Sequence, residues 1–361
     1  MSITQKLVAA GVALLCGVLL AACGKDMPDA SSPANAGGAA LTKLHGAGST
    51  FVAPLMERWI EAYGKGRPEL SIVYDAVGSG EGIERFIAGG VDFGASDAAM
   101  NDAEIARVRS PGGRGVKLIP VAAGEVVVAY NIPGLRGDLR LPRDVYADIF
   151  LGRITHWNDA RIAAANPGMD LPARRIQVVA RRDSSGTTYA FTNHLAAVSD
   201  DWRNGPGTGK LIDWPGSAMI ALGNEGVAQR LRITSNSIGY IEYGFARRLG
   251  LRMAALENRA GQFVVPGAAG GKAALDAAAQ TIPDDLRLFL PDPSGASAYP
   301  MVSLVWVLLH DSYPEPARGE ALRDAVGWGL GEGQAMAEDM GYIPLPDSLV
   351  VRARQALNGV H

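Results

Sequence analysis

The residues with the clearest chemical potential lie in the stretch ARRDSSGTTYAF, residues 180–191, directly after the apolar run at 176–180. Two arginines, an aspartate, two serines, a glycine and two threonines follow one another where a strand is expected to give way to a helix. Guanidinium and hydroxyl groups are hydrogen-bond donors, and glycine lets a bound group approach the main chain closely. This combination of residue types suits the binding of an anion.

Two other segments, GAGSTF at 46–51 and GSGEG at 78–82, have the same character, with small and hydroxyl residues where a helix is expected to begin. Helix N-termini expose unpaired N–H groups and the positive end of the helix dipole, which attract anions. Serine and threonine also cap ordinary helices, so each junction alone is consistent with simple capping. The three junctions together, with Arg181 at the third, predict an anion site where helix N-termini converge.

A carboxylate, Asp97, is expected beside this site. It follows a predicted strand in VDFGASDAAM, residues 91–100, and Asn101 with Glu104 has the pattern of a capping box. One interpretation of Asp97 is an Asx turn. The alternative is a hydrogen-bond acceptor for an anion that still carries a proton, because two unprotonated anions would repel each other.

The elements that must position these residues alternate along the chain. Strands are predicted in LSIVYDAVG, VKLIPVAAGEVVVAYNI and RIQVVA, and helices in LMERWIEAYGK, EGIERFIAGG and TTYAFTNHLAAV. Another helical stretch, residues 320–340, follows the apolar run MVSLVWVLLH. The alternation predicts an α/β protein with mainly parallel sheets, in which ligands bind at the carboxyl ends of strands.

Composition limits the function classes. The chain has 361 residues, 48% hydrophobic and 20% charged, which is typical of a globular protein with two domains of ordinary size. Its 34 basic and 37 acidic residues form no long block of like charge, so a nucleic-acid groove is not indicated. No histidine cluster has metal-ligand spacing.

The N-terminal segment predicts export. One lysine precedes an uncharged run at residues 7–23, which has the pattern of a signal peptide. Its end, Leu20-Ala21-Ala22-Cys23, resembles the lipobox of bacterial lipoproteins, which implies cleavage after residue 22 and lipidation of Cys23; the alternative is an ordinary cleavage site. Residues 24–42 are small, polar and rich in Pro and Gly, and predict a flexible tether from lipidated Cys23 to the domain.

Several blocks together resemble the periplasmic phosphate-binding protein of the high-affinity phosphate ABC transporter. They are GAGSTF, VGSGEG, VDFGASDA, IFLGRITHWNDARIAAANPG, RRDSSGTTYAFT, GTGK and SIGYIEYGFA, in that family's order. The resemblance implies the two-lobed periplasmic-binding-protein fold (type II), with a mixed, mainly parallel sheet flanked by helices in each lobe. The first lobe would comprise residues 43–122 and 291–361, and the second residues 123–290.

The resemblance also implies which residues contact inorganic phosphate. The matching positions are Thr50, Phe51, Ser79, Asp97, Arg181, Ser185, Gly186 and Thr187, and Asp183 matches the carboxylate that orients the arginine. The arginine would supply a planar, charge-assisted fork. No catalytic residue, metal or cofactor is implied. The partners would be phosphate and the permease subunits of an ABC importer, and the protein would be a monomer anchored by lipid to the cell envelope.

Three residues depart from the family pattern: Ser184 stands where glycine is frequent, Arg182 where a small residue is common, and Glu81 within a junction of small residues. A Glu81 side chain in the cleft would weaken anion binding. The alternative is that it points to solvent in the first turn of its helix, where a negative charge is favourable.

Two other functions are compatible with parts of the sequence. Ser185 could be the nucleophile of a phosphate-ester hydrolase with His156, His194 or His310 as its base, although no Gly-x-Ser-x-Gly elbow is present. The same binding site could also serve a surface-tethered scavenger or sensor that docks no permease. Gly24 after the lipidated cysteine allows sorting to an outer membrane, which would favour that role.

Overall fold

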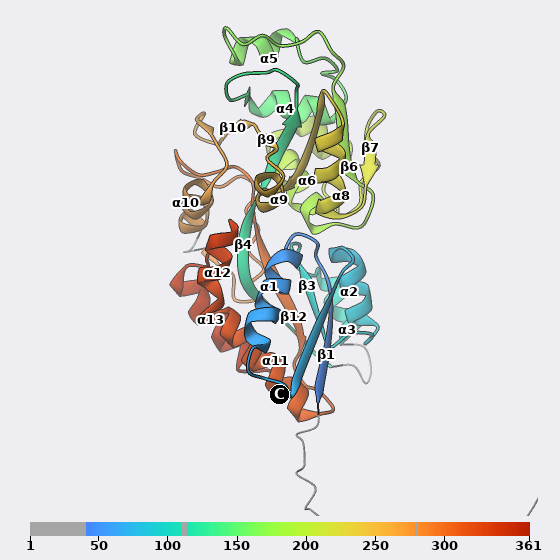
Figure 1. The fold of residues 1–361 in the computed structure, drawn as a ribbon, viewed down its shortest axis with the longest axis vertical. Coiled ribbons are helices and arrows are strands. Elements are labelled where there is room, and N and C mark those ends of the chain that lie inside the picture. The colour runs from blue at the N-terminus through green and yellow to red at the C-terminus, as the bar shows by residue number, and fades with distance from the viewer. Residues whose placement is uncertain (1–40, 110–113, 279–280) are drawn as a thin grey trace, which may run out of the picture. The chain divides into compact units, whose positions relative to one another are not determined.

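The computed structural model describes residues 41–109, 114–278 and 281–361 (Figure 1). Cys23, the predicted signal peptide and nearly all of the predicted tether lie outside the described residues. Thr42, which we expected at the end of the tether, already belongs to a strand and pairs with Leu70. No helix in these described ranges is long and apolar enough to span a membrane.

The main sheet is mixed, and its strands run in the order β2-β1-β3-β12-β4-β8-β6-β7, with β9 also paired to β4. Their bounds are β1 Thr42–Gly48, β2 Leu70–Ala76, β3 Phe93–Ser96, β4 Val116–Asn131, β6 Gln177–Arg181, β7 Met219–Ala221, β8 Ser237–Glu242, β9 Arg252–Met253 and β12 Val302–His310. Pairing is parallel at both flanks and antiparallel around β4 and β12. A small separate sheet contains β5 Arg140–Leu141, β10 Ala255–Glu257 and β11 Phe263–Val264. The predicted strands at 70–78, 116–132 and 175–180 are confirmed.

The long strand β4 joins the two halves of the sheet. Residues 116–125 pair with β12, whereas residues 126–131 pair with β8. The register with β12 shifts at Val305/Trp306, opposite Pro120. Proline has no N–H to donate to the ladder, so an irregularity of pairing at this position has a direct cause. The half of the sheet that contains β1, β2 and β3 and the half that contains β6 are therefore joined by continuous hydrogen bonding.

Helices cover both halves of the sheet (Figure 1). They are α1 Ala53–Gly64, α2 Ser79–Ile87, α3 Asp102–Val108, α4 Arg143–Phe150, α5 Ala160–Ala165, α6 Gly186–Val198, α7 Asp200–Asn204, α8 Gly223–Ile233, α9 Tyr243–Arg248, α10 Ala268–Ala278, α11 Pro316–Gly329, α12 Gly333–Met340 and α13 Asp347–Leu357. The predicted helical stretch 320–340 is two helices, α11 and α12. The C-terminal helices return to the first strands, where α11 packs against β1 and α13 against β4.

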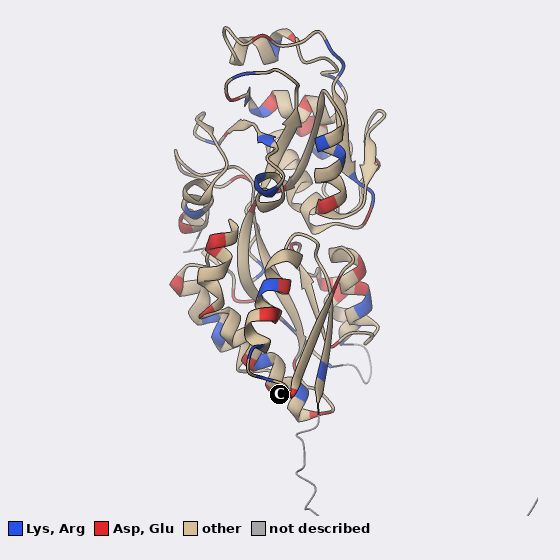
Figure 2. Ribbon diagram, in the orientation of Figure 1, with Lys and Arg blue, Asp and Glu red and all other residues tan. Residues whose placement is uncertain are grey.

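Charges are mixed over the molecule. In the ribbon of Figure 2, the positions of acidic and basic residues are interspersed along the helices, often on the same helix. This agrees with the formal net charge of −3.

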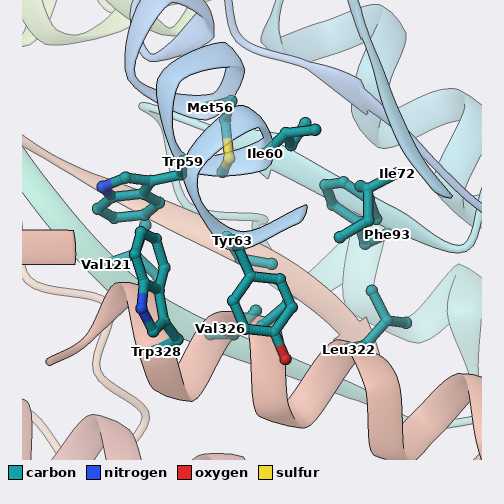
Figure 3. Close-up of a pocket in the computed structure, with 12 residues that line it drawn as sticks. Met56, Trp59, Ile60, Tyr63, Ile72, Phe93, Val121, Leu322, Val326 and Trp328 are labelled. Carbon is teal, nitrogen blue, oxygen red and sulfur yellow. The ribbon is translucent and has the colours of Figure 1, made fainter. Parts of the chain in front are cut away.

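A small apolar cavity of about 50 Å³ lies in the core between α1 and α11 (Figure 3). Trp59 and Tyr63 of α1 face Leu322, Val326 and Trp328 from the region of α11 across it. Because its lining is almost entirely apolar, this cavity does not suit a polar ligand such as an anion.

Two buried carboxylates lie on neighbouring strands where β4 passes between the halves of the sheet. Glu125 accepts a hydrogen bond from the Gly267 amide at 2.7 Å. Glu242 accepts from the Gly244 amide at 2.6 Å and the Phe245 amide at 3.1 Å. Burial is the largest influence on both groups, and it raises the pKa of Glu125 to about 8 and the pKa of Glu242 to about 7.

Glu125→Gln is expected to flatten the pH dependence of folding stability. The folded protein keeps protons that the unfolded chain releases above the ordinary glutamate pKa of about 4.3. The wild-type free energy of unfolding should therefore fall, by about 1.4 kcal/mol per pH unit for each group, as pH rises from about 5 to about 7. Glutamine does not titrate, so the substitution removes the contribution of Glu125 to this pH dependence of the free energy of unfolding. Urea unfolding at each pH tests this, with the exposed Glu320→Gln as a control that should follow wild type; parallel curves for Glu125→Gln and wild type would contradict it.

Candidate functional site

The predicted anion-site residues lie at the carboxyl ends of β1, β3 and β6. Strands β1 and β3 are parallel neighbours, with Gly48 opposite Ala95. The residues that follow them, Ser49 and Asp97, are therefore brought together, and the Ser49 hydroxyl donates to Asp97 Oδ1 at 2.7 Å. Parallel strands end at the same edge of a sheet, which is why residues distant in sequence meet here.

Two of the three predicted helix N-termini reach this edge. Helix α2 begins at Ser79, and its N-cap Gly78 has φ 97°, a conformation that glycine adopts without strain. Helix α6 begins at Gly186, and the N-cap Ser185 accepts a hydrogen bond from the Thr188 amide at 3.1 Å. The predicted capping box of α3, with Asn101 and Glu104, is also present.

The prediction for the first junction is wrong in its detail. Helix α1 begins only at Ala53, after the N-cap Val52, so Ser49 and Thr50 precede it rather than cap it. Proline in the first turn of α1 favours this start, because a helix leaves that N–H unpaired in any case. The Ser49 hydroxyl is occupied otherwise, since it accepts from the Phe51 amide at 3.0 Å and donates to Asp97.

Asp97 is the centre of the cluster and is 2% exposed. Besides Ser49, it accepts hydrogen bonds from Ser79 Oγ at 2.6 Å and from Thr187 Oγ1 at 2.9 Å. These donors come from three separate segments, an arrangement that an Asx turn does not need. The same three hydroxyls could donate to the oxygens of a bound anion.

Arg181 lies beside this cluster, with 1% of its side chain exposed. Its Nε donates to Asp183 Oδ1 at 2.8 Å, Nη2 donates to Asp183 Oδ2, and Nη1 points to Thr187 Oγ1 at 3.5 Å. Burial alone would raise the pKa of Asp183, but hydrogen bonds and the charge of Arg181, with the Gly223 amide, outweigh it and lower that pKa. Asp183 thus holds the guanidinium fork in one orientation, with Nη1 directed toward the cluster.

Close approach of helices α2 and α6 requires glycine on both. A Cβ on Gly186 would lie 2.3 Å from Asp97 Oδ1 and 2.6 Å from Ser79 Oγ. A Cβ on Gly80 would lie 1.9 Å from Ser184 Oγ, and the Gly80 amide donates to the Ser184 carbonyl at 2.9 Å. Any larger residue would push the two helix N-termini apart.

The remaining predicted residues lie at the border of the cluster. Phe51 is buried, and its carbonyl accepts from the Tyr342 hydroxyl at 2.7 Å. Thr50 Oγ1 does not bond Asp97; it accepts from the amide and from Nδ2 of Asn224, both at 3.1 Å.

Sequence reasoning missed two participants, Ser49 and Asn224. Ser49 belongs to the GAGSTF segment that predicted a helix start, but nothing in the sequence indicated its hydrogen bond to Asp97. Asn224 follows Gly223 at the start of α8, directly after the short strand β7. This is a fourth junction of the same kind, and a three-residue strand gives too little periodicity to reveal it.

The three departures lie outside the buried cluster. Glu81 has 53% of its side chain exposed and bonds Arg85 Nε at 2.8 Å, as its solvent-facing interpretation predicted. Arg182 is exposed. Ser184 contributes its carbonyl to the contact between α2 and α6. None of these residues places an additional charge next to Asp97.

The histidines proposed as a base do not meet Ser185. His194 bonds the Tyr146 hydroxyl at 2.7 Å and the Pro291 carbonyl at 2.5 Å, and burial lowers its pKa to about 4. His310 stacks on Phe86 with ring centroids 4.2 Å apart, and His156 bonds its neighbour Thr155.

In the part of the chain that the structure describes, no group of three or more His, Cys, Asp or Glu side chains could hold a metal ion.

Openings flank the cluster on two sides. One cavity of about 620 Å³ is lined by Thr50, Val77, Asp183, Gly223 and Arg248 among others. Another, of about 420 Å³, is lined by Gly80, Glu81, Glu84, Glu104, Asp183, Ser184 and Lys210 among others. Beside the second opening, Lys210 Nζ forms an ion pair with Glu104 Oε1 at 2.5 Å.

The mixed sheet with its flanking helices is the fold of periplasmic binding proteins. A family model described as the PBP superfamily domain matches residues 33–326. A phosphate-binding protein from Stenotrophomonas maltophilia has a similar fold, with a TM-score of 0.70 at 18% identity over 87% of this chain and 93% of that chain. A high-affinity periplasmic phosphate-binding protein solved with bound phosphate gives the same TM-score at 22% identity and the same coverage. The expected periplasmic-binding-protein fold is therefore confirmed.

Curated relatives narrow the class. Phosphate-binding protein PstS of Xylella fastidiosa is 36% identical over 323 residues, which is 89% of this chain and 86% of that protein. PstS of Methanocaldococcus jannaschii is 37% identical over 351 residues, which is 92% of this chain and 89% of that protein. The chain belongs to the PstS family of phosphate-binding proteins within the PBP superfamily, and the resemblance drawn from the sequence blocks is confirmed.

Proposed function

We propose that this protein binds inorganic phosphate between two lobes and delivers it to the permease subunits of an ABC-type phosphate importer. The observation that carries the proposal is the buried cluster in which Asp97 accepts from Ser49, Ser79 and Thr187 beside the guanidinium of Arg181. Membership in the PstS family supports phosphate as the anion. A protonated phosphate could give its hydrogen to Asp97 and accept from the hydroxyls that Asp97 now holds.

The proposed ligand contacts are Thr50, Phe51, Ser79, Asp97, Arg181, Ser185, Gly186 and Thr187, with Asp183 orienting the arginine. The proposed first lobe is residues 43–122 and 291–361, and the second is residues 123–290. With these bounds, Thr187 to Asp97, Gly80 to Ser184 and Lys210 to Glu104 are contacts between lobes. A ligand that touches both lobes would therefore favour the closed form.

The remaining features of the proposal concern role and location. We propose a binding protein without catalytic activity, because the Ser185 hydroxyl caps α6 and bonds no histidine within the described residues. We further propose that the protein is exported, lipidated at Cys23 and monomeric. A scavenger or sensor role would use the same site residues and differ only in whether a permease is docked.

Phosphate is expected to bind and to compact the protein. Isothermal titration should show saturable heat with phosphate, and small-angle scattering should show a smaller radius of gyration after phosphate is added. Lobe closure around the ligand is the physical reason. Absence of binding would refute the choice of phosphate, whereas binding with an unchanged radius would refute closure alone.

A further inference from the structure

Asn224 makes hydrogen bonds on both sides of the proposed cleft. Its side chain is fully buried, at 0% exposed. Nδ2 donates to Thr50 Oγ1 at 3.1 Å and to Thr187 Oγ1 at 3.2 Å. Oδ1 accepts from the Glu242 amide at 3.0 Å. That amide can only donate, so the oxygen of Asn224 must face Glu242 and the nitrogen must face the two threonines.

The two threonine oxygens are thereby limited in what they can do. Thr50 Oγ1 accepts from the main-chain amide of Asn224 as well as from Nδ2, which occupies both acceptor positions of a hydroxyl. Thr187 Oγ1 accepts from Asn224 Nδ2 and lies 3.5 Å from Arg181 Nη1, and it donates to Asp97. Each hydroxyl can then act only as a donor; Thr187 gives its single hydrogen to Asp97 in this structure and would turn it to the anion when Asp97 accepts the proton of that anion.

We propose that Asn224 is a positioning residue that fixes Thr50 and Thr187 as hydrogen-bond donors toward the bound anion. The inference rests on the proposed function, and it adds a residue that acts through other side chains. A hydroxyl that is free to rotate can face an anion with its lone pairs, whereas a hydroxyl whose oxygen is saturated cannot. Asn224 also ties Thr50 of the proposed first lobe to residues of the second.

A double-mutant cycle on phosphate affinity tests this role. Thr50→Val is expected to weaken binding about 10-fold through the loss of one hydrogen bond to an anion. Asn224→Ala should weaken it about 10-fold to 100-fold, because two hydroxyls lose their orientation. In the Thr50→Val background, Asn224→Ala should cost clearly less than it costs alone, because one of those hydroxyls is already absent.

Asn224→Asp provides a second variant of nearly the same shape. Its carboxylate accepts from the threonines instead of donating to them, so both hydroxyls turn away from the anion, and it adds a negative charge. It should weaken binding more than Asn224→Ala does. If Asn224→Ala fails to fold, Asn224→Asp with and without Thr50→Val completes the cycle.

Asn166→Ala is the matched control. Asn166 is 5% exposed and bonds the main chain of Arg140 and Ile162, so its loss lowers stability without touching the cluster. Its phosphate affinity should equal that of wild type. Fold-changes that multiply independently for Asn224 and Thr50 would overturn the inference. A wild-type protein that binds no phosphate would instead refute the proposed function.

Discussion

Sulfate is expected to displace phosphate only at concentrations about 10⁴-fold to 10⁵-fold higher than those at which phosphate itself competes. Both ions are tetrahedral and similar in size, but phosphate near neutral pH keeps at least one proton and sulfate keeps none. Asp97 is 2% exposed and, as a carboxylate, can only accept hydrogen bonds. With sulfate, two unprotonated oxygens would face each other at a buried carboxylate, which costs more than a missing hydrogen bond.

Asp97→Asn should narrow this preference, because the amide can donate to sulfate where the carboxylate could not. Arsenate, which keeps its proton, should compete partially with phosphate. Competition binding on wild type and Asp97→Asn measures both effects. Asp75→Asn serves as the control, since Asp75 pairs with His45 and Arg85 away from the cluster. Displacement of phosphate by comparable sulfate concentrations would refute the role of Asp97 and the phosphate assignment together.

Arg181→Lys is expected to reduce phosphate affinity by about 1.5 to 3 kcal/mol, or roughly 10-fold to 150-fold. Lysine keeps the positive charge, but a single ammonium cannot bond both oxygens of Asp183 and also direct a donor toward Thr187, as the guanidinium does. The side chain is 1% exposed, so water cannot replace the lost hydrogen bonds. Asp183 would remain partly buried with an incomplete set of donors.

Arg182→Lys is the matched control, because Arg182 is the next residue and is exposed. Isothermal titration of the two variants separates the loss of the fork from a general effect of substitution at the end of β6. Wild-type affinity in Arg181→Lys would remove this residue from the site. Equal losses in both variants would point to a disturbance of β6 instead.

The features that the sequence determined by itself are those whose causes are local. Strands such as β2 follow from apolar residues and β-branched side chains within a few positions. The capping box of α3 and the Ser185 cap of α6 each join residues three positions apart. Recognition of the family also rested on short contiguous blocks such as GAGSTF and VGSGEG, which can be identified without knowledge of the tertiary structure.

Local rules were insufficient where a distant partner competed for the same group. Hydroxyl residues in GAGSTF predicted a helix cap, yet Ser49 bonds Asp97, 48 positions away, and α1 begins later. Asn224 and Thr50 are 174 positions apart, so their contact has no trace in either neighbourhood. The sequence alone determined the α/β class and which residue types could bind an anion. Only the tertiary structure decided which hydroxyls meet Asp97, because β4 and the parallel strand ends bring together segments that are far apart in the chain and that no local pattern connects.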